Sequence, residues 1–325
     1  MSNMKLVDGV LDKELEKEPM KKGYGRGLLD AGKANTNVVA SSSDVAGSTG
    51  SDLFENEFPD RFIEVGVAEQ NLVTVGSGLA AMGKIPFVAA YGAFSPGRNW
   101  EQIKTTICIN DRPVKLIATH VGLSDGPDGA THQMLEDIAL MRVLANMVVI
   151  VPCDSNEAYK ATLLIAKTKK PAYMRIARDD TNIITTTETP FEIGKAYNFH
   201  EGTDITLVGT GRMTYNCLLA ASELAKHGIK AEVIHSPTIK PLDKKTILES
   251  AKKTGFVITA EEAQIAGGLG GAVAELLSEE HPTPMKRIGI QDQFGQSGSP
   301  SDLFRHYKLT ANDIYEAALE LLDKK

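Results

Sequence analysis

The chain has 325 residues, of which 42% are hydrophobic, 24% are charged and 6% are aromatic, and its formal charge is -7 at pH 7. This length is sufficient for two domains with full cores, and the acidic balance argues against a general binder of nucleic acids or anionic membranes. No apolar run approaches the ~20 residues of a membrane span, and the amino terminus lacks a signal pattern. Because Cys108, Cys153 and Cys217 show no paired spacing, we expect no disulfide framework, no zinc site and a location in the reducing cytoplasm.

The first half of the chain predicts an α/β domain. Residues 1–20 are rich in Lys, Glu and Asp, which predicts a solvated arm with a helical turn over residues 11–17. A helix over residues 24–31 precedes a series of apolar, β-branched runs that alternate with helical segments. We expect strands at residues 38–42, 62–65, 87–91, 114–119, 148–152 and 172–176. This alternation favours right-handed crossovers, so residues 21–180 should form a mostly parallel open sheet with helices on both faces.

Residues 61–71, RFIEVGVAEQN, run a strand directly into a helix with a carboxylate at the junction. Residues 62–65 predict a short buried strand, and Gly66 allows a sharp exit from it. The helix over residues 68–82 is apolar or small on nearly every face, which predicts a buried helix. Glu69 lies in its first turn, where the helix dipole favours a carboxylate and burial opposes its charge. Glu69 is therefore either a tuned proton carrier or an ordinary capping glutamate.

Most reactive side chains of this half lie just beyond the carboxyl end of an expected strand. Strand by strand, they are Asp44 and Ser48; Glu69; Tyr91 and Phe94; His120, Asp125, Asp128 and His132; Asp154; Arg178 and Asp179. Ligands of an open parallel sheet bind at that edge, so these residues are candidates for one crevice. Tyr91 and Phe94, one turn apart, are either core filler or a stacking platform.

The loop at residues 119–133, THVGLSDGPDGATHQ, carries two histidines and two aspartates among glycines. This composition buries little, so its order needs a ligand or a partner. A metal site is one alternative, but two histidines twelve residues apart are poorly spaced as ligands. A hydrogen-bonding pocket for a polyhydroxylated or phosphorylated molecule fits better, although His132 by itself is equally consistent with a structural histidine.

Residues 181–193 are Thr-rich and contain Pro190, which predicts a linker to a second domain over residues 194–325. That domain should be a smaller α/β unit, with strands at 205–208, 231–235, 256–259 and 287–290 and helices at 215–227, 244–253, 267–277 and 311–322. The turn GTGRMT at residues 209–214 lies where a dinucleotide fingerprint would lie, but Thr214 replaces its third glycine. We expect a tight turn that packs helix on sheet there.

Four motifs, in this order, resemble the carboxyl-terminal half of transketolase, a thiamine-diphosphate enzyme. They are EVGVAEQN at residues 64–71, DGATHQ at 128–133, GGLGGAVAELL at 267–277 and FGQSGSPSDLFRHYKLT at 294–310. The resemblance covers residues 23–318 and implies a pyrimidine-binding domain followed by a smaller C-terminal domain. It also implies the transfer of a two-carbon ketol unit from a ketose phosphate to an aldose phosphate, as in the pentose phosphate pathway.

The resemblance implies a missing part as well. Transketolases hold the cofactor's diphosphate and its Mg²⁺ (or Ca²⁺) with a Gly-Asp-Gly stretch and a later Asn, and this chain contains no such stretch. The chain thus resembles the split form of the family, in which a separate N-terminal, diphosphate-binding subunit supplies that domain and the metal. An α₂β₂ heterotetramer with active sites between chains is implied.

By the same resemblance, Glu69 would hydrogen-bond the aminopyrimidine ring of the cofactor and help its amino group remove the thiazolium proton. Tyr91 and Phe94 match the aromatic pair against which the pyrimidine stacks, although the family's first position is usually Phe. Asp44 matches an aspartate near the cofactor and the boundary between subunits.

The substrate residues follow in the same way. Asp128 and His132 match groups that bind the hydroxyls of the donor ketose, with His132 assisting proton movement as the carbon–carbon bond breaks. Ser48, His120 and Arg178 match the phosphate-binding set, in which arginine is suited to a bidentate contact.

Three alternatives stay open. Deoxyxylulose-phosphate synthase has a similar AEQ segment, but it is usually one longer chain and has Tyr-Pro-Arg-Gly where this chain has Ile-Ala-Arg-Asp at residues 176–179. The β subunit of 2-oxoacid dehydrogenase E1 components is a separate chain of similar size, but it is not expected to carry DGATHQ or FGQSG. A non-catalytic binding relative is the third, and the presence of Glu69, Asp128 and His132 together counts against it.

The donor is undetermined among xylulose 5-phosphate, fructose 6-phosphate and a less common ketose. Lys21 stands near the place of the family's other phosphate-binding arginine, and lysine cannot make the same forked contact. The position and strength of phosphate binding are therefore open.

Overall fold

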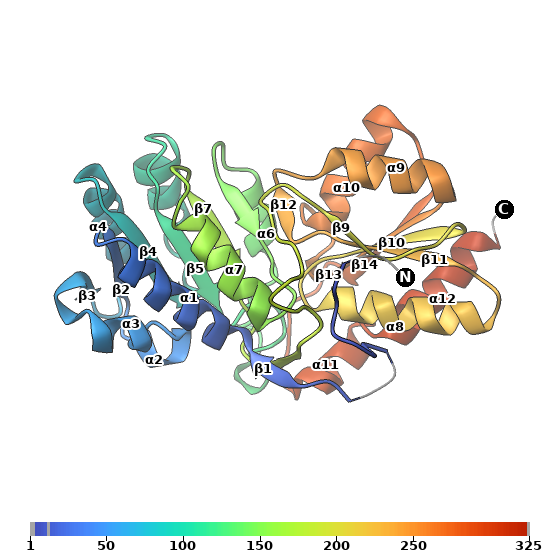
Figure 1. Ribbon diagram of the computed structural model, residues 1–325, viewed down its shortest axis with the longest axis horizontal. Helices are drawn as coiled ribbons and strands as arrows, with labels where there is room; N and C mark the ends of the chain where they lie inside the picture. Colours follow the sequence, from blue (N-terminus) through green and yellow to red (C-terminus); the bar gives the residue numbers. More distant parts are fainter. Residues whose placement is uncertain (1–3, 12–13, 324–325) are drawn as a thin grey trace.

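Two α/β units lie side by side along the long axis of the molecule (Figure 1). The computed structural model describes residues 4–11 and 14–323. The first unit contains β1 (Lys17–Pro19), α1 (Met20–Ala34), β2 (Val38–Ser42), α2 (Ala46–Thr49), α3 (Asp52–Glu57), η1 (Pro59–Arg61), β3 (Phe62–Glu64), α4 (Glu69–Ala81), β4 (Ile85–Tyr91), α5 (Trp100–Gln102), η2 (Ile103–Cys108), β5 (Lys115–Thr119), η3 (Gly126–Asp128), α6 (Asp137–Arg142), β6 (Val148–Ile150), α7 (Ser155–Ile165), β7 (Ala172–Arg175) and β8 (Asp180–Asn182). The second contains β9 (Tyr197–His200), β10 (Ile205–Gly209), α8 (Met213–Lys226), β11 (Ala231–His235), β12 (Thr238–Lys240), α9 (Lys244–Thr254), β13 (Val257–Gln264), α10 (Leu269–Glu280), β14 (Met285–Ile290), α11 (Pro300–His306) and α12 (Ala311–Leu322).

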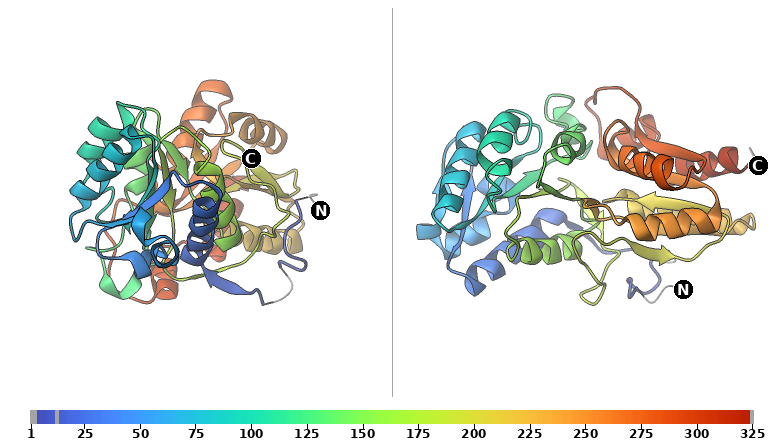
Figure 2. Two further views of the ribbon diagram at one scale, coloured as in Figure 1. Left: turned by 60° about the vertical axis from the view of Figure 1, so that its left-hand side comes forward. Right: turned by 90° about the horizontal axis from the view of Figure 1, so that it is seen from above.

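The first unit is organised around a seven-stranded sheet with the order β12-β6-β7-β5-β4-β2-β3. All its neighbours run parallel except β12, which the second unit contributes and which pairs antiparallel with β6. Side chains alternate across β4, so that Val88 packs in the core under α4, η2 and α6 while Phe87 packs in the core under α1 and α7. Both faces are covered by helices, as predicted (Figure 2).

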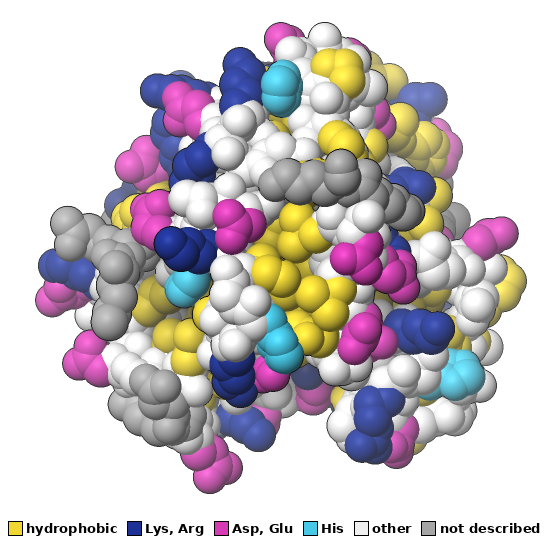
Figure 3. Space-filling model, turned by 90° about the vertical axis from the view of Figure 1, so that its right-hand side faces the viewer, with side chains coloured by type: hydrophobic (Ala, Val, Ile, Leu, Met, Phe, Trp, Pro, Cys, Tyr) yellow, Lys and Arg dark blue, Asp and Glu magenta, His cyan; other side chains and the backbone are white. Residues whose placement is uncertain are grey.

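The second unit has a five-stranded sheet with the order β14-β13-β10-β11-β9, parallel except for β9. Apolar residues of α8 and α12 pack in one core with this sheet, and those of α9 and α10 belong to a core that continues into the first unit. The expected fold class, a mostly parallel open sheet followed by a smaller α/β unit, is confirmed. The outer face of the second unit mixes acidic and basic side chains around an apolar patch (Figure 3).

The amino-terminal arm is not solvated throughout, contrary to the prediction from its charge. Strand β1 pairs antiparallel with β8, and Leu15 is only 6% exposed, in the core of the second unit. Residues 14–16 are not helical, and residues 12 and 13 of the expected turn lie outside the described residues. Burying Leu15 and pairing β8 outweighs the tendency of the flanking charges to stay in water. The expected linker is therefore partly a strand, and the four segment boundaries (1–20, 21–180, 181–193 and 194–325) stay predictions.

Two expectations for residues 61–82 were also wrong. β3 is an edge strand whose residues are half-buried or exposed, not buried. Helix α4 is buried on one face only, because Asn71 and Gly78 on its outer face are exposed. Val67 before this helix and Met82 after it are 71% and 82% exposed.

No helix in the described part of the chain is long and apolar enough to cross a membrane.

Candidate active site

The carboxyl ends of β4 and β5 bring several predicted residues to one edge of the first sheet. In this register Tyr91 lies opposite Thr119, so Tyr91 and His120 leave neighbouring strands side by side. Their rings stack with centroids 3.9 Å apart. Phe94 meets the ring of His132 edge-on at 5.3 Å. The loop at residues 119–133 therefore lies against both aromatic residues.

Glu69 is a buried carboxylate at the start of α4. It is only 5% exposed, and Asn99 Nδ2 donates a hydrogen bond to its backbone carbonyl at 2.8 Å. Its Oε2 accepts a hydrogen bond from Arg98 Nη1 at 3.1 Å. Gly66 leaves the preceding strand with φ 70°, a conformation that glycine adopts without steric cost. The sharp strand exit and the buried position of Glu69 agree with the sequence, whereas Arg98 was not foreseen.

A second glutamate at this edge, Glu64, was missed by sequence reasoning. Its Oε1 accepts hydrogen bonds from the backbone N–H groups of Asp44 at 2.8 Å and Gly66 at 2.7 Å. One carboxylate thus joins the turn after β2 to the turn after β3. The side chain of Asp44 itself is exposed at the same edge.

Arg178 and two aspartates form an ionic cluster at the mouth of the site. Arg178 Nη1 donates to Asp125 Oδ1 at 2.8 Å and lies 3.4 Å from Asp128 Oδ2. Asp125 is fully buried, and this burial raises its pKa to about 6 in spite of the neighbouring Arg178 charge. Arg178 and Asp128 are 44% and 50% exposed, so both are accessible to a ligand. The sequence named Asp125 as a candidate for this crevice but gave it no specific role.

Cationic and neutral donors gather next to this cluster. His120 is 7% exposed, and burial lowers its pKa to about 4, with the charges of Arg178 and Lys21 acting in the same direction. His120 is therefore neutral at pH 7. Lys21 Nζ donates to the carbonyl of Gly47 at 3.2 Å, beside the predicted Ser48. The set is suited to an anionic group.

The second unit holds the loop that carries Asp128 and His132. Glu262 Oε1 accepts a hydrogen bond from the backbone N–H of Leu123 at 2.7 Å. Gln133 Nε2 donates to the carbonyl of Gln296 at 2.9 Å, so the DGATHQ and FGQSG motifs touch each other. These contacts join residues more than a hundred positions apart, and local sequence patterns carry no signal for them.

Two of the strand-end aspartates do not join the site. Asp154 caps α7 through the backbone N–H of Glu157 at 2.9 Å and accepts hydrogen bonds from Thr185. Asp179 accepts a hydrogen bond from Arg212 Nη1 of the second unit at 2.6 Å. Both aspartates stabilise contacts within the protein.

One group of potential metal ligands occurs among the described residues. Cys153, Glu157 and His235 are buried where the two units meet, with ligand atoms within 4.8 Å of one another. His235 Nε2 lies 3.0 and 2.9 Å from the two carboxylate oxygens of Glu157, which is the geometry of a hydrogen-bonded pair. This pair links β11 to α7 away from the site described above.

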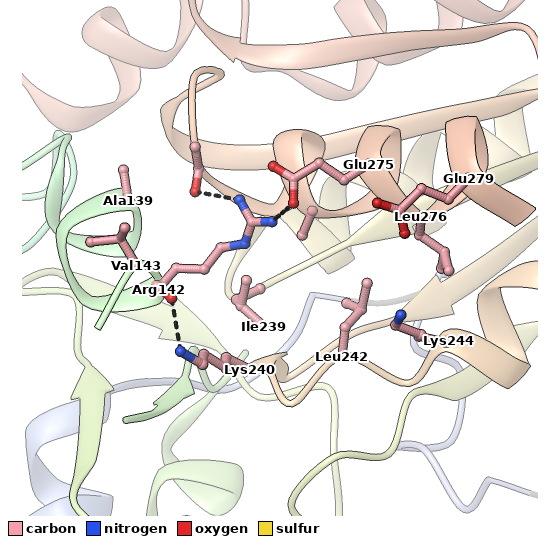
Figure 4. Close-up of a pocket in the computed structure, with 12 residues that line it drawn as sticks. Ala139, Arg142, Val143, Ile239, Lys240, Leu242, Lys244, Glu275, Leu276 and Glu279 are labelled. Carbon is pink, nitrogen blue, oxygen red and sulfur yellow. Dashed lines mark hydrogen bonds and ion pairs between the residues drawn. The ribbon is translucent and has the colours of Figure 1, made fainter. Parts of the chain in front are cut away.

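A cavity of about 610 Å³ lies between α6, β12 and α10 (Figure 4). Arg142 crosses it, donates to the carbonyl of Gly267 at 3.3 Å and pairs with Glu275. Lys240 Nζ donates to the backbone carbonyl of Arg142 at 3.0 Å. None of the predicted site residues lines this cavity.

The edge described here fits an aminopyrimidine ring in two respects. The Glu69 carboxylate can hydrogen-bond a ring nitrogen, because at 5% exposure water competes little for that bond. The Phe94 ring lies within reach of the same place, since Arg98 contacts Glu69 and also lies 4.2 Å from the Phe94 centroid. A planar group can therefore bond Glu69 and stack on Phe94 at once.

Comparison with known proteins shows the family to which the chain belongs. Residues 16–183 match the transketolase pyrimidine-binding domain and residues 194–314 match the transketolase C-terminal domain. A Methanocaldococcus jannaschii protein described as the C-terminal section of a transketolase is 42% identical over 94% of this chain and 97% of its own length. A 6-deoxy-6-sulfo-D-fructose transketolase subunit from a Clostridium species is 38% identical over 96% and 97%. One subunit of the apulose-4-phosphate transketolase of Phocaeicola vulgatus is 35% identical over 94% and 97%.

Solved structures show the same relationship. A split-gene transketolase, described as an inactive beta4 tetramer, superposes with a TM-score of 0.87 at 39% identity over 95% of this chain and 99% of that one. The transketolase of Campylobacter jejuni shares the fold with a TM-score of 0.79 at 21% identity, over 94% of this chain and 47% of that one. The chain belongs to the transketolase family, whose members depend on thiamine diphosphate, and it corresponds to the C-terminal subunit of a split enzyme.

Proposed function

We propose that this chain is one of two subunits of a transketolase that transfers a two-carbon ketol unit from a ketose phosphate to an aldose phosphate. The observation that supports this most is the buried Glu69 carboxylate next to Phe94, at an edge that also carries Asp128, His132 and Arg178. Thiamine diphosphate would supply the nucleophilic carbon that takes up the ketol unit. The protein residues bind, orient and move protons.

Glu69 and the aromatic residues would form the cofactor side of the site. Glu69 would hydrogen-bond a pyrimidine nitrogen and assist proton movement there, and its 5% exposure and the hydrogen bond from Asn99 to its backbone support this role. Phe94 would stack on the pyrimidine. Tyr91 already stacks on His120, so we infer that it also fixes the orientation of this histidine. Asp44 would lie at the boundary with the partner chain.

The remaining polar residues would bind the sugar. Asp128 is exposed and His132 half-buried in a loop that is otherwise mostly buried, and both would contact the ketose hydroxyls, with His132 assisting proton movement. Ser48, His120 and Arg178 would hold the anionic end of the sugar, with Lys21 in place of a further arginine. Because Arg178 is bonded to Asp125 and lies near Asp128, a substrate anion must compete with carboxylates for it.

The site would be completed by a separate N-terminal subunit that holds the diphosphate and its Mg²⁺ or Ca²⁺, in an α₂β₂ heterotetramer. The absence of a Gly-Asp-Gly stretch supports this. So does the weakly polar outer face of α4, flanked by Val67 and Met82, which are 71% and 82% exposed in the single chain. We also propose that the enzyme is cytoplasmic, since its three cysteines are buried and unpaired.

A donor screen on the co-expressed pair tests the proposal. Xylulose 5-phosphate, fructose 6-phosphate, 6-deoxy-6-sulfofructose and apulose 4-phosphate are each supplied with an aldose phosphate acceptor, because relatives of this chain are named for the last two donors. We expect cofactor-dependent ketol transfer from at least one donor. Binding of cofactor without transfer from any donor would favour a non-catalytic relative, and formation of deoxyxylulose 5-phosphate from pyruvate would favour the synthase.

Sedimentation of the purified pair tests the assembly. An α₂β₂ species should form when both chains are present. A stable monomer of this chain in the presence of its partner would contradict the proposed heterotetramer.

A further inference from the structure

Arg98 makes two contacts at the cofactor side of the site. Its Nη1 donates to Glu69 Oε2 at 3.1 Å, and its Cζ lies 4.2 Å from the centroid of the Phe94 ring. The Arg98 side chain is 53% exposed, whereas the Glu69 side chain is 5% exposed. A planar, delocalised cation thus lies over an aromatic ring while one of its N–H groups bonds a buried carboxylate.

These are the two contacts that the proposed function assigns to the aminopyrimidine ring. An aminopyrimidine is also planar, also stacks on an aromatic face and also shares a proton with a carboxylate. Two groups cannot occupy the same position, and the Arg98 guanidinium already lies within bonding distance of both Glu69 and Phe94. A ring that used the same Oε2 and the same face of Phe94 would meet the guanidinium there, so Arg98 would have to leave first.

We propose that Arg98 occupies the aminopyrimidine position in the cofactor-free chain and swings out when thiamine diphosphate binds. The inference rests on the proposed function of this site. Arg98 is able to leave because its bond to Glu69 is its only side-chain hydrogen bond in the described part of the chain. The backbone of Glu69 stays in place when Arg98 leaves, because Asn99 bonds the Glu69 carbonyl separately.

The expected change in cofactor affinity follows from the fraction of the protein in which Arg98 has left the aminopyrimidine position. The apparent affinity of a ligand falls by the fraction of protein that is free to bind it. An ion pair with one solvent-exposed partner is weak, so removing Arg98 should tighten cofactor binding only by a factor of about three to ten. Removing a residue that bound the cofactor would weaken the affinity, and removing one that merely stabilised the fold would leave it unchanged.

The test measures thiamine diphosphate affinity by titration calorimetry on the co-purified pair with Mg²⁺ present. Arg98→Ala should lower the dissociation constant, and Arg98→Lys should lie between it and wild type, because lysine keeps the charge but loses the flat contact with Phe94. Lys104→Ala is the matched control: Lys104 is exposed nearby, over Trp100, and no contact joins it to Glu69. This control reports the effect of removing one positive charge on an anionic cofactor.

Each possible result of these titrations bears on a different part of the proposal. An Arg98→Ala dissociation constant equal to or above that of Lys104→Ala overturns the inference. Arg98→Lys with wild-type affinity overturns the part that depends on stacking over Phe94. Failure of the wild-type pair to bind thiamine diphosphate at all rejects the proposed function instead, so the two failures are distinguishable.

Discussion

The carboxyl edges of both sheets carry charged side chains, which are partly exposed at the first sheet and buried at the second. At the first edge, Arg178 and Asp128 are 44% and 50% exposed and can meet a ligand. At the second, Glu261 and Glu262 near the end of β13 are 0% and 3% exposed. Glu261 accepts hydrogen bonds from the first backbone N–H groups of α10, both at 2.7 Å. The second edge thus satisfies its polar groups within the protein.

The contacts of the second edge explain why it is buried. The carbonyl of Glu262 accepts a hydrogen bond from Arg175 of the first unit at 2.7 Å, and Arg175 in turn donates to the buried Asp137 at 2.8 Å. Glu262 Oε1 bonds the backbone of Leu123. The edge that binds ligands in many open sheets here holds the loop of the neighbouring unit.

The GTGRMT turn belongs to this second edge. It follows β10, which lies between β11 and β13, at the point where the strand order reverses. A Cβ on Gly209 would lie 2.7 Å from Thr214 Cα, so the turn packs helix against strand as predicted. Arg212 bonds Asp179 of the first unit. The turn therefore contributes to the contact between the units.

The largest expected effect comes from the first edge. Glu69→Ala should leave the fold intact and slow exchange of the cofactor's C2 proton by a factor of about 10² to 10⁴, because a positioned proton carrier is lost. The measurement is proton exchange followed by NMR on the assembled pair. Glu101→Ala removes an exposed carboxylate nearby as the matched control. Unchanged exchange in Glu69→Ala would remove Glu69 from the mechanism.

At the second edge the same kind of substitution should act on stability. Glu262→Ala leaves the N–H of Leu123 unbonded and takes one counterion away from the neighbouring Arg175 and Arg212, so the free energy of unfolding should fall by about 3 kcal/mol. Urea denaturation of the chain measures it. Glu275→Ala, which removes an exposed partner of Arg142, should cost less than about 1 kcal/mol. Equal costs for the two variants would contradict the contrast between the edges.

Sequence patterns anticipated the first edge better than the second. Strand ends with polar residues are a local signal, and Tyr91, His120 and Arg178 follow from it because parallel strands in register place their ends together. β12 was missed because three residues joining another unit's sheet leave no periodic pattern. The amphipathicity of α4 was misjudged because small residues look the same whether they face a core or a partner.

Sequence patterns could not predict the contacts that support the site. Arg98 lies in an irregular segment, and only the folded chain places it against Glu69. Gln133 and Gln296 were both found within motifs, but their contact depends on the packing of two units. Motif resemblance identifies the residues, whereas the hydrogen bonds between motifs depend on how the two units pack in three dimensions.

The first edge should also set a pH dependence of stability. The pKa of His120 is lowered from 6.5 to about 4 in the folded chain, chiefly by burial. Between these values the unfolded chain binds more protons, so the free energy of unfolding falls as the pH drops from 6.5 toward 4. His120→Gln should remove about 2 kcal/mol of this dependence. Denaturation at several pH values, with the exposed His306→Gln as control, checks it. Parallel pH profiles for wild type and His120→Gln would contradict the assignment.

The smallest effect should appear where the two edges meet. A Cβ on Gly295 would lie 1.7 Å from Gln133 Oε1, so the buried Gln133 amide must move and give up its hydrogen bonds to Gly126 and Gln296, which hold the loop that carries Asp128. Gly295→Ala should therefore raise the KM for the donor by about threefold to tenfold, the cost of about one displaced hydrogen bond, while C2 proton exchange stays at the wild-type rate.

Gly271→Ala controls for that substitution, because its added Cβ meets only Arg142 at an ordinary 3.6 Å. A fall in the C2 exchange rate together with the rise in KM would show that the second unit supports Glu69 as well as the sugar-binding loop. An unchanged KM would show that the contact between the DGATHQ and FGQSG motifs serves stability alone. The split between the two readouts locates the boundary between cofactor activation, for which the first unit would not need the second, and sugar binding, for which it would rely on the second.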